Sequence, residues 1–235
     1  MILPKFLKIN SLIFTFALSS LFGFSSEPEA IDYGTRRLQS VHNKLRLLYG
    51  SFQEEYPEQL MTAMYLPSDA KVLELGANVG RNSCVIASLL SDSRNLVSVE
   101  SCPDSARYLQ KNRDHNRLKF HIEASAVSKI PLIQRGWFTI PGNEVLPGYV
   151  KVKTITFDQL QRKYKITFDT LVADCEGALY YILRDDPAVL NNIKLVIVEN
   201  DYPDANHRNY VESQFLLNGL ELVYNSGNFY QVWKK

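Results

Sequence analysis

The hydrophobic pattern changes character after Pro67, where short apolar runs begin to alternate with helical segments. The runs that resemble strands are residues 71–75, 96–100, 118–123, 170–174 and 194–199. Near-continuous Val, Ile and Leu, as in the run KLVIVEN, is typical of strands that are covered on both faces. Because strands that alternate with helices indicate βαβ units, the pattern predicts an α/β fold with a mostly parallel sheet.

Two segments depart from this alternation. Residues 130–157 contain three prolines and three glycines among short β-prone pieces, and we interpret them as an insertion over a sheet edge that faces the substrate. At the C-terminus, two β-prone runs flank residues 225–228, which read Asn-Ser-Gly-Asn. This arrangement predicts a C-terminal antiparallel β-hairpin.

Residues 27–66 carry a helical pattern and form a predicted N-terminal extension. Apolar side chains recur there at spacings of three and four, at Leu38, Val41, Leu45 and Leu48. This spacing predicts a helix that stops near Gly50, followed by a second helix at about residues 57–65. We expect both helices to cover the main domain at residues 67–235, and nothing in them demands chemistry.

The first 26 residues differ from the rest of the chain. Lys5 and Lys8 precede an apolar run at residues 9–24, and Glu27 and Glu29 follow it. This layout is typical of a secretory signal peptide, and an N-terminal membrane anchor is the alternative. We therefore expect a protein that is secreted or membrane-associated, with any membrane association made through residues 9–24.

Composition and charge exclude several classes of function. The formal net charge is +1, from 26 basic and 25 acidic residues, and the chain has no long basic run. Nucleic acid is therefore not an expected partner. Cys84, Cys102 and Cys175 are odd in number and lie far apart without a metal-ligand spacing, which argues against a disulfide framework and a zinc site.

The first strand of the alternating region runs into a glycine turn, in the sequence VLELGANVG. Gly76 and Gly80 permit close approach of the backbone to a ligand, and the helix behind them offers free N–H groups to an anion. Glu100 ends the next strand, and it follows the glycine loop by the ~20 residues expected of a carboxylate that binds a ribose. Together these features predict a nucleoside site.

The glycine pattern narrows the choice of nucleoside. A dinucleotide fingerprint requires glycine at positions where this chain has Asn78 and Arg81. S-adenosylmethionine lacks a pyrophosphate, and its ribose suits Glu100, its carboxylate suits the helix N-terminus, and its ammonium suits an acid such as Glu74. A glycine turn that binds no cofactor is the alternative.

A second group of acids follows the strand at residues 170–174. Asp174 and Glu176 lie on the same side if the strand continues, and Gly177 lets the chain turn into the next helix. Such a pair can position a hydroxyl substrate, hold a divalent metal or accept a proton, or one acid can simply cap the helix. Glu199, at the end of the next strand, is a further catalytic candidate, and His207 is a weaker one. We assign no metal.

These blocks, taken in order, resemble the FkbM family of S-adenosylmethionine-dependent methyltransferases. The resemblance covers roughly residues 71–200 and rests on VLELGANVGRNS, VSVESCPDSARYLQKNRDHN, FHIEASAVS, VKTITFDQL, LVADCEGALYYIL and VIVEN. It implies a Rossmann-like class I methyltransferase fold, in which the sheet has seven strands and the last is antiparallel. It also implies methyl transfer to an oxygen, often a sugar hydroxyl of a glycan or small-molecule acceptor.

The resemblance assigns roles by block. The implied cofactor contacts are Gly76, Ala77, Asn78 and Gly80 in the loop, Glu100 and Ser101 at the ribose, and Ala124, Ser125 and Ala126 at the adenine. Asp174, Glu176 and Gly177 carry over as the acidic motif beside the methyl group, with Asp174 as the base or substrate positioner. Cys175 departs from the family, which usually has an aliphatic residue there, and Val99 stands where an aromatic residue is common.

Two other functions remain open at this stage. A nicotinamide-dependent oxidoreductase shares the fold class but needs a pyrophosphate loop that this turn does not provide. A non-catalytic secreted carbohydrate-binding or interaction module would bind no cofactor at all. Trp137 and Tyr149 in the insertion suit stacking on a sugar, and a role in the core fits them equally well.

Overall fold

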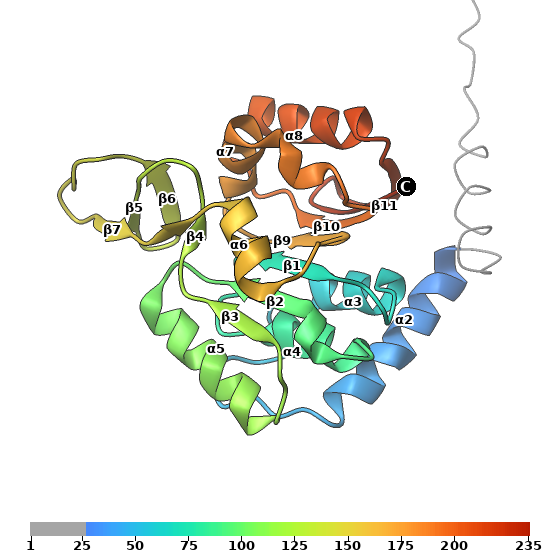
Figure 1. The fold of residues 1–235 in the computed structure, drawn as a ribbon. Coiled ribbons are helices and arrows are strands. Elements are labelled where there is room, and N and C mark those ends of the chain that lie inside the picture. The colour runs from blue at the N-terminus through green and yellow to red at the C-terminus, as the bar shows by residue number, and fades with distance from the viewer. Residues whose placement is uncertain (1–26) are drawn as a thin grey trace, which may run out of the picture.

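The computed structural model describes residues 27–235, and within that range the centre of the molecule is a seven-stranded sheet (Figure 1). Its strands are β1 (Val72–Leu75), β2 (Leu96–Val99), β3 (His121–Glu123), β9 (Thr170–Ala173), β10 (Leu195–Glu199), β11 (Glu221–Ser226) and β12 (Tyr230–Lys234). The order across the sheet is β11-β12-β10-β9-β1-β2-β3, with β12 antiparallel to both neighbours and the other pairings parallel. This confirms the predicted Rossmann-like class I methyltransferase fold, including its C-terminal hairpin.

Helices cover both faces of the sheet, as expected for strands that are apolar on both sides. One face packs against α2 (Glu27–His42), α3 (Tyr56–Tyr65), α4 (Arg81–Leu89) and α5 (Pro103–His115). The other packs against α6 (Phe157–Tyr164), α7 (Ala178–Asp185) and α8 (Ala205–Leu217). Short 3₁₀ turns, η1 (Ser93–Asn95) and η2 (Pro187–Leu190), precede β2 and β10. Successive residues of each strand join opposite cores, Val72 on the α4 side and Leu73 on the α7 side.

The N-terminal extension belongs to the same core as the sheet, because Leu38 of α2 and Met61 of α3 are buried against it. The second predicted helix is confirmed as α3, but the first ends at His42 rather than near Gly50. Leu48 is consequently 54% exposed. The backbone N–H of Leu48 donates instead to the side chain of Asn112 on α5, a long-range bond that a local pattern does not reveal.

The insertion forms small sheets of its own beside the main one. Strand β4 (Ala126–Val127) pairs with β8 (Thr154–Ile155). Strands β5 (Leu132–Arg135), β6 (Phe138–Pro141) and β7 (Val150–Val152) form an antiparallel sheet, which we call the flap and which projects beyond the edge of the molecule (Figure 1). The predicted series of short β pieces over a sheet edge is therefore present.

The predicted signal peptide or membrane anchor lies outside the described residues, as does the apolar run at residues 9–24 that would associate with a membrane. Among the helices of residues 27–235, none has both the length and the apolar composition that membrane crossing requires.

Candidate functional site

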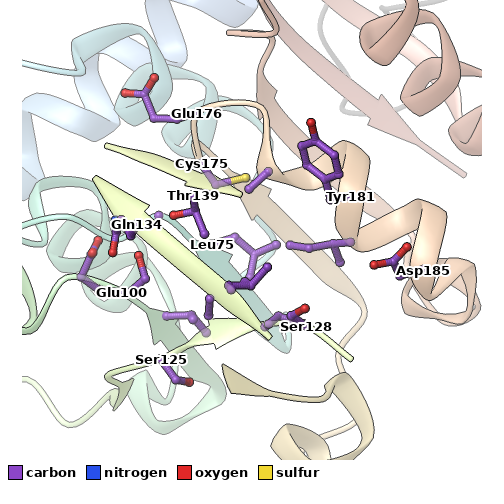
Figure 2. A pocket seen from close by; sticks show the side chains of 18 of the residues that line it. Leu75, Glu100, Ser125, Ser128, Gln134, Thr139, Cys175, Glu176, Tyr181 and Asp185 are labelled. Atoms are coloured by element: carbon purple, nitrogen blue, oxygen red, sulfur yellow. The ribbon is translucent and has the colours of Figure 1, made fainter. Parts of the chain in front are cut away.

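A pocket opens at the carboxyl ends of β1, β2 and β9, where the strand order reverses direction (Figure 2). In open α/β sheets this switch point is the usual ligand site. The empty space measures about 1070 Å³, including part that is open to solvent. Of the residues predicted as site residues, those that line the pocket are Gly76, Asn78, Glu100, Ser101, Ser125, Ala126, Asp174 and Glu176.

The loop after β1 is pressed against the turn after β9. Gly76 has a φ of +82°, and a Cβ atom there would lie 1.6 Å from the carbonyl oxygen of Asp174. The backbone N–H groups of Gly76 and Ala77 both donate to the carbonyl of Val99, at 3.1 and 3.0 Å. The missing side chain of Gly76 therefore lets the ends of β1, β2 and β9 meet at one place.

Asn78 and Gly80 shape the rest of this loop. Asn78 has a φ of 48°, a left-handed conformation that asparagine tolerates better than most residues. Gly80 has a φ of 90° and starts α4, and a Cβ atom there would lie 2.3 Å from Leu109 Cδ1 on α5. Asparagine thus replaces a loop glycine without loss of the turn, and Gly80 serves helix packing.

Glu100 connects the loop to the end of β2. Its Oε2 accepts from the backbone N–H of Asn78 at 2.8 Å, and its Oε1 accepts from the N–H of Cys102 at 2.7 Å. The residue is 6% exposed, and burial raises the pKa of this carboxyl although the backbone donors oppose the shift. Each carboxylate oxygen has a second lone pair, so Glu100 retains capacity to accept from ligand hydroxyls.

Glu74 does not reach the pocket, contrary to its predicted contact with an ammonium group. It lies on the face of β1 that packs against α4, one residue out of phase with Leu73 and Leu75. Its Oε2 accepts from Ser83 Oγ at 2.5 Å and Ser98 Oγ at 2.6 Å. Burial raises its pKa to about 7. Strand parity therefore makes Glu74 a core residue.

Other predicted cofactor contacts also lie apart from the pocket lining. Ala77 is buried among the core residues beside α4, and Ala124 is exposed. Ser125 and Ala126, by contrast, line the pocket at the start of β4. A contiguous sequence block therefore places only part of its residues in the site.

The two acids of the DCEG turn do not share a face. Strand β9 ends at Ala173, and Glu176 has a φ of 52°, which breaks the alternation that the sequence prediction assumed. Glu176 is exposed at the edge of the pocket in Figure 2, whereas Asp174 is partly buried. The amide of Gly177, at the start of α7, donates to Asp201 Oδ1 at 2.9 Å.

Asp174 lies in an environment that disfavours its charge. Burial is the main cause, followed by the nearby carboxylates of Glu199 and Glu55, and together they raise its pKa to about 8. Glu199, the last residue of β10, is thus close to Asp174 as its candidate role requires, although it lies outside the pocket lining.

The sequence interpretation missed two acids that the structure brings to Asp174. Glu55 precedes α3 and Glu58 lies in its first turn, a segment to which no chemistry was assigned. Carboxylate oxygens of Glu55, Glu58 and Asp174 all lie within 4.8 Å of one another. The only local signal was a pair of acids at a helix start, which interaction with the helix dipole explains equally well.

The walls of the pocket are mostly apolar between two polar ends. Leu75 lies between Glu100 on one side and Tyr181 and Asp185 from α7 on the other (Figure 2), and Val99 also lines the pocket. The flap contributes Gln134, Thr139 and Trp137, and Trp137 is 56% exposed. A mostly apolar pocket with a few convergent polar groups is typical of a small-molecule site.

Two aromatic candidates have other partners. Tyr149 packs against the guanidinium of Arg135, 5.0 Å from its ring centroid. His207 stacks on Tyr180 with ring centroids 3.7 Å apart. Neither residue belongs to the pocket lining. Trp137, the other aromatic candidate of the insertion, does line the pocket. Gln134 and Thr139 of the flap also line it, and since they belong to no motif, sequence patterns could not identify them.

The comparisons with known proteins find matches among solved structures. Neither the protein-family models nor the curated proteins contain a match to the chain. Among solved structures, a putative O-methyltransferase from Klebsiella pneumoniae is 15% identical, with a TM-score of 0.46 and 94% of each chain covered. An O-methyltransferase from Bacillus cereus, in complex with SAH, is 13% identical, with a TM-score of 0.45 over 94% of this chain and 96% of that one.

A ribosomal protein L11 methylase from Lactobacillus delbrueckii subsp. bulgaricus is 12% identical, with a TM-score of 0.49 over 80% of this chain and 79% of that one. At these identities and TM-scores the similarity carries no argument about activity.

Proposed function

We propose that the protein is an S-adenosylmethionine-dependent O-methyltransferase that acts on a hydroxyl of a sugar, glycan or related small molecule. One observation carries the proposal: the loop around Gly76, Glu100 and Asp174 surround a single pocket at the switch point of the sheet. The resemblance of residues 71–200 to the FkbM family supports an oxygen as the acceptor atom.

The residues present fit this cofactor. The free lone pairs of Glu100 suit ribose hydroxyls, and the small side chains of Ser125 and Ala126 leave room for a flat base. Carboxylates at the other end of the pocket, Asp174 foremost, suit a positively charged ligand. When bound, S-adenosylmethionine supplies a methyl group attached to a positively charged sulfur.

The chain's own contribution is orientation and proton removal. Asp174 positions the acceptor hydroxyl and accepts its proton at a carboxylate oxygen, while the acceptor oxygen forms its new bond to the methyl carbon. Glu176, at the rim, contacts the body of the acceptor together with Trp137 of the flap. The apolar walls at Leu75 and Val99 exclude water from the reacting groups.

A nicotinamide dinucleotide is disfavoured by the same geometry. Its pyrophosphate would need free backbone N–H groups in the loop. Those of Gly76 and Ala77 are bonded to Val99, and that of Asn78 is bonded to Glu100. The carboxylates around Asp174 would also repel a phosphate.

The proposal is tested by calorimetric titration of the purified protein with S-adenosylhomocysteine. We expect saturable binding that falls by about tenfold or more in Glu100→Gln, since the new amide group faces two backbone N–H donors that need an acceptor. Glu221→Gln, at an exposed position on β11, is the matched control. Absence of binding heat, together with absence of thermal protection, would refute the cofactor assignment.

The acceptor and the location are tested separately. Mass spectrometry of candidate glycans incubated with the enzyme and cofactor reports the methylated product directly. We also propose that residues 1–26 act as a signal peptide or membrane anchor. Cell fractionation with protease protection distinguishes these two roles from a chain that remains unattached.

A further inference from the structure

Four carboxylates converge beside the pocket from separate parts of the chain. They belong to Glu55 before α3, Glu58 in its first turn, Asp174 after β9 and Glu199 at the end of β10. Oxygens of the first three lie within 4.8 Å of one another. The carboxyl of Glu199 is close enough to that of Glu58 to raise its pKa, although burial is the larger cause.

Glu58 supplies a second and independent observation. Its side chain is 3% exposed, and its Oε1 has no hydrogen-bond partner among residues 27–235. Buried polar atoms in proteins almost always have a partner. When Glu58 is ionised its oxygens only accept, so the missing partner of Oε1 is then a donor or a cation.

The positive charge close to this cluster falls short of its negative charge. Arg81 donates from Nη1 to Glu55 Oε1 at 2.6 Å and from Nε to Glu54 Oε2 at 2.5 Å. Asn78 Nδ2 makes a longer contact with Glu55, at 3.3 Å. The guanidinium therefore contacts Glu55 alone among the cluster, and within residues 27–235 neither Glu58 nor Asp174 forms a salt bridge.

We propose that Glu55, Glu58 and Asp174, with Glu199 behind Glu58, form a binding site for a divalent cation. Oxygen-only ligands are typical of hard cations. At the ~2.3–2.6 Å ligand distances of Ca²⁺, two oxygens on one ion lie up to about 5 Å apart, whereas the shorter distances of Mg²⁺ demand a tighter group. Three oxygens within 4.8 Å of one another are compatible with Ca²⁺, and Mn²⁺, which takes the same oxygen ligands, serves as a spectroscopic probe of the site.

The ion would lie at the acid end of the pocket, because Asp174 belongs to both the cluster and the pocket lining. Binding of the metal ion does not depend on methyl transfer. An ammonium group, such as that of the proposed cofactor, is the other cation that carboxylates attract. A divalent ion balances two of the carboxylate charges and an ammonium only one, so the charge count favours the metal.

The site is tested on the full-length chain after treatment with a chelator and desalting, without cofactor. Mn²⁺ is titrated and the free ion is followed by electron paramagnetic resonance, and Ca²⁺ is then added as a competitor. We expect saturable Mn²⁺ binding that Ca²⁺ displaces. Glu58→Gln and Asp174→Asn are each expected to weaken it by about tenfold or more, because each removes one ligand charge.

Glu221→Gln is the control, since Glu221 is exposed on β11 and lies outside the cluster. Its Mn²⁺ affinity is expected to equal that of the wild type. Absence of Mn²⁺ binding, or equal affinity in the wild type and both cluster variants, would overturn the proposal. If the wild type binds no Mn²⁺ and Glu58→Gln binds S-adenosylhomocysteine more weakly than the wild type does, the cluster holds the ammonium group of the cofactor and the proposal is likewise overturned.

Discussion

Replacement of Glu74 by glutamine tests whether this acid belongs to the core, as the structure places it, or to the ligand, as the sequence suggested. Glu74 is buried beneath α4 and accepts from Ser83 and Ser98. Burial raises its pKa from 4.5 to about 7. Glutamine keeps the shape and one acceptor oxygen but cannot ionise.

The sign and size of the effect follow from proton linkage. Between pH 4.5 and 7 the folded protein keeps the Glu74 proton while the unfolded chain loses it, so stability from this group falls as pH rises. Each unit of pKa shift corresponds to about 1.4 kcal/mol, and the loss between about pH 5 and pH 8 comes to about 2–3 kcal/mol. The variant lacks this loss, so its advantage over the wild type should grow by that amount.

The assay is urea unfolding of both proteins at pH 5 and pH 8, with exposed Glu221→Gln as the control. Asp174 also has a raised pKa, but it is present in both proteins and cancels in the difference. Parallel stability curves for wild type and Glu74→Gln would refute the linkage argument. A loss of S-adenosylhomocysteine affinity in the variant, with the fold intact, would refute the placement of Glu74 outside the pocket.

Two further substitutions probe how the loop is held. Gly76→Ala is expected to lower the free energy of unfolding by about 3–5 kcal/mol, because the cost of a positive φ adds to a clash with Asp174. Gly219 has a φ of +75° and open space around it, so Gly219→Ala should lower the free energy of unfolding by only about 1–2 kcal/mol. Equal losses by thermal unfolding would contradict the clash. Asn112→Ala removes a buried side chain and leaves its backbone partners at Leu48, Tyr49 and Val79 unpaired, and it should lose about 2–3 kcal/mol in urea unfolding. Asn116→Ala breaks a similar but exposed bridge to Arg46 and should lose less, and a loss as large as that of Asn112→Ala would contradict the role of burial.

The proposed metal site connects to these predictions through Asp174. An ion beside Asp174 would lower the pKa of this carboxyl and so favour its ionised form. The ionised form is the one that accepts a proton. Removal of the ion by a chelator is therefore expected to slow methyl transfer if the two proposals hold together. Metal binding and cofactor binding are measured separately, so one proposal can fail without the other.

Local patterns were sufficient for the elements and for the place of the pocket. Apolar runs bounded by turns identified the strands, and the carboxyl ends of parallel strands necessarily share one edge of a sheet. Gly76 and Glu100 were therefore predictable as neighbours, although they are far apart in the chain. Asn78 was predicted to stand in place of a loop glycine, and its left-handed conformation explains how it can.

What only the tertiary structure decided was direction and distance. The sequence by itself could not tell that β1 turns Glu74 toward α4, because strand parity is fixed by what packs on each face. It could not end α2 at His42, since the partner that holds Leu48 lies on α5. Nor could it bring Glu58 to Asp174, because α3 crosses the sheet at a position set by core packing, and acids so far apart in sequence carry no local sign that they meet.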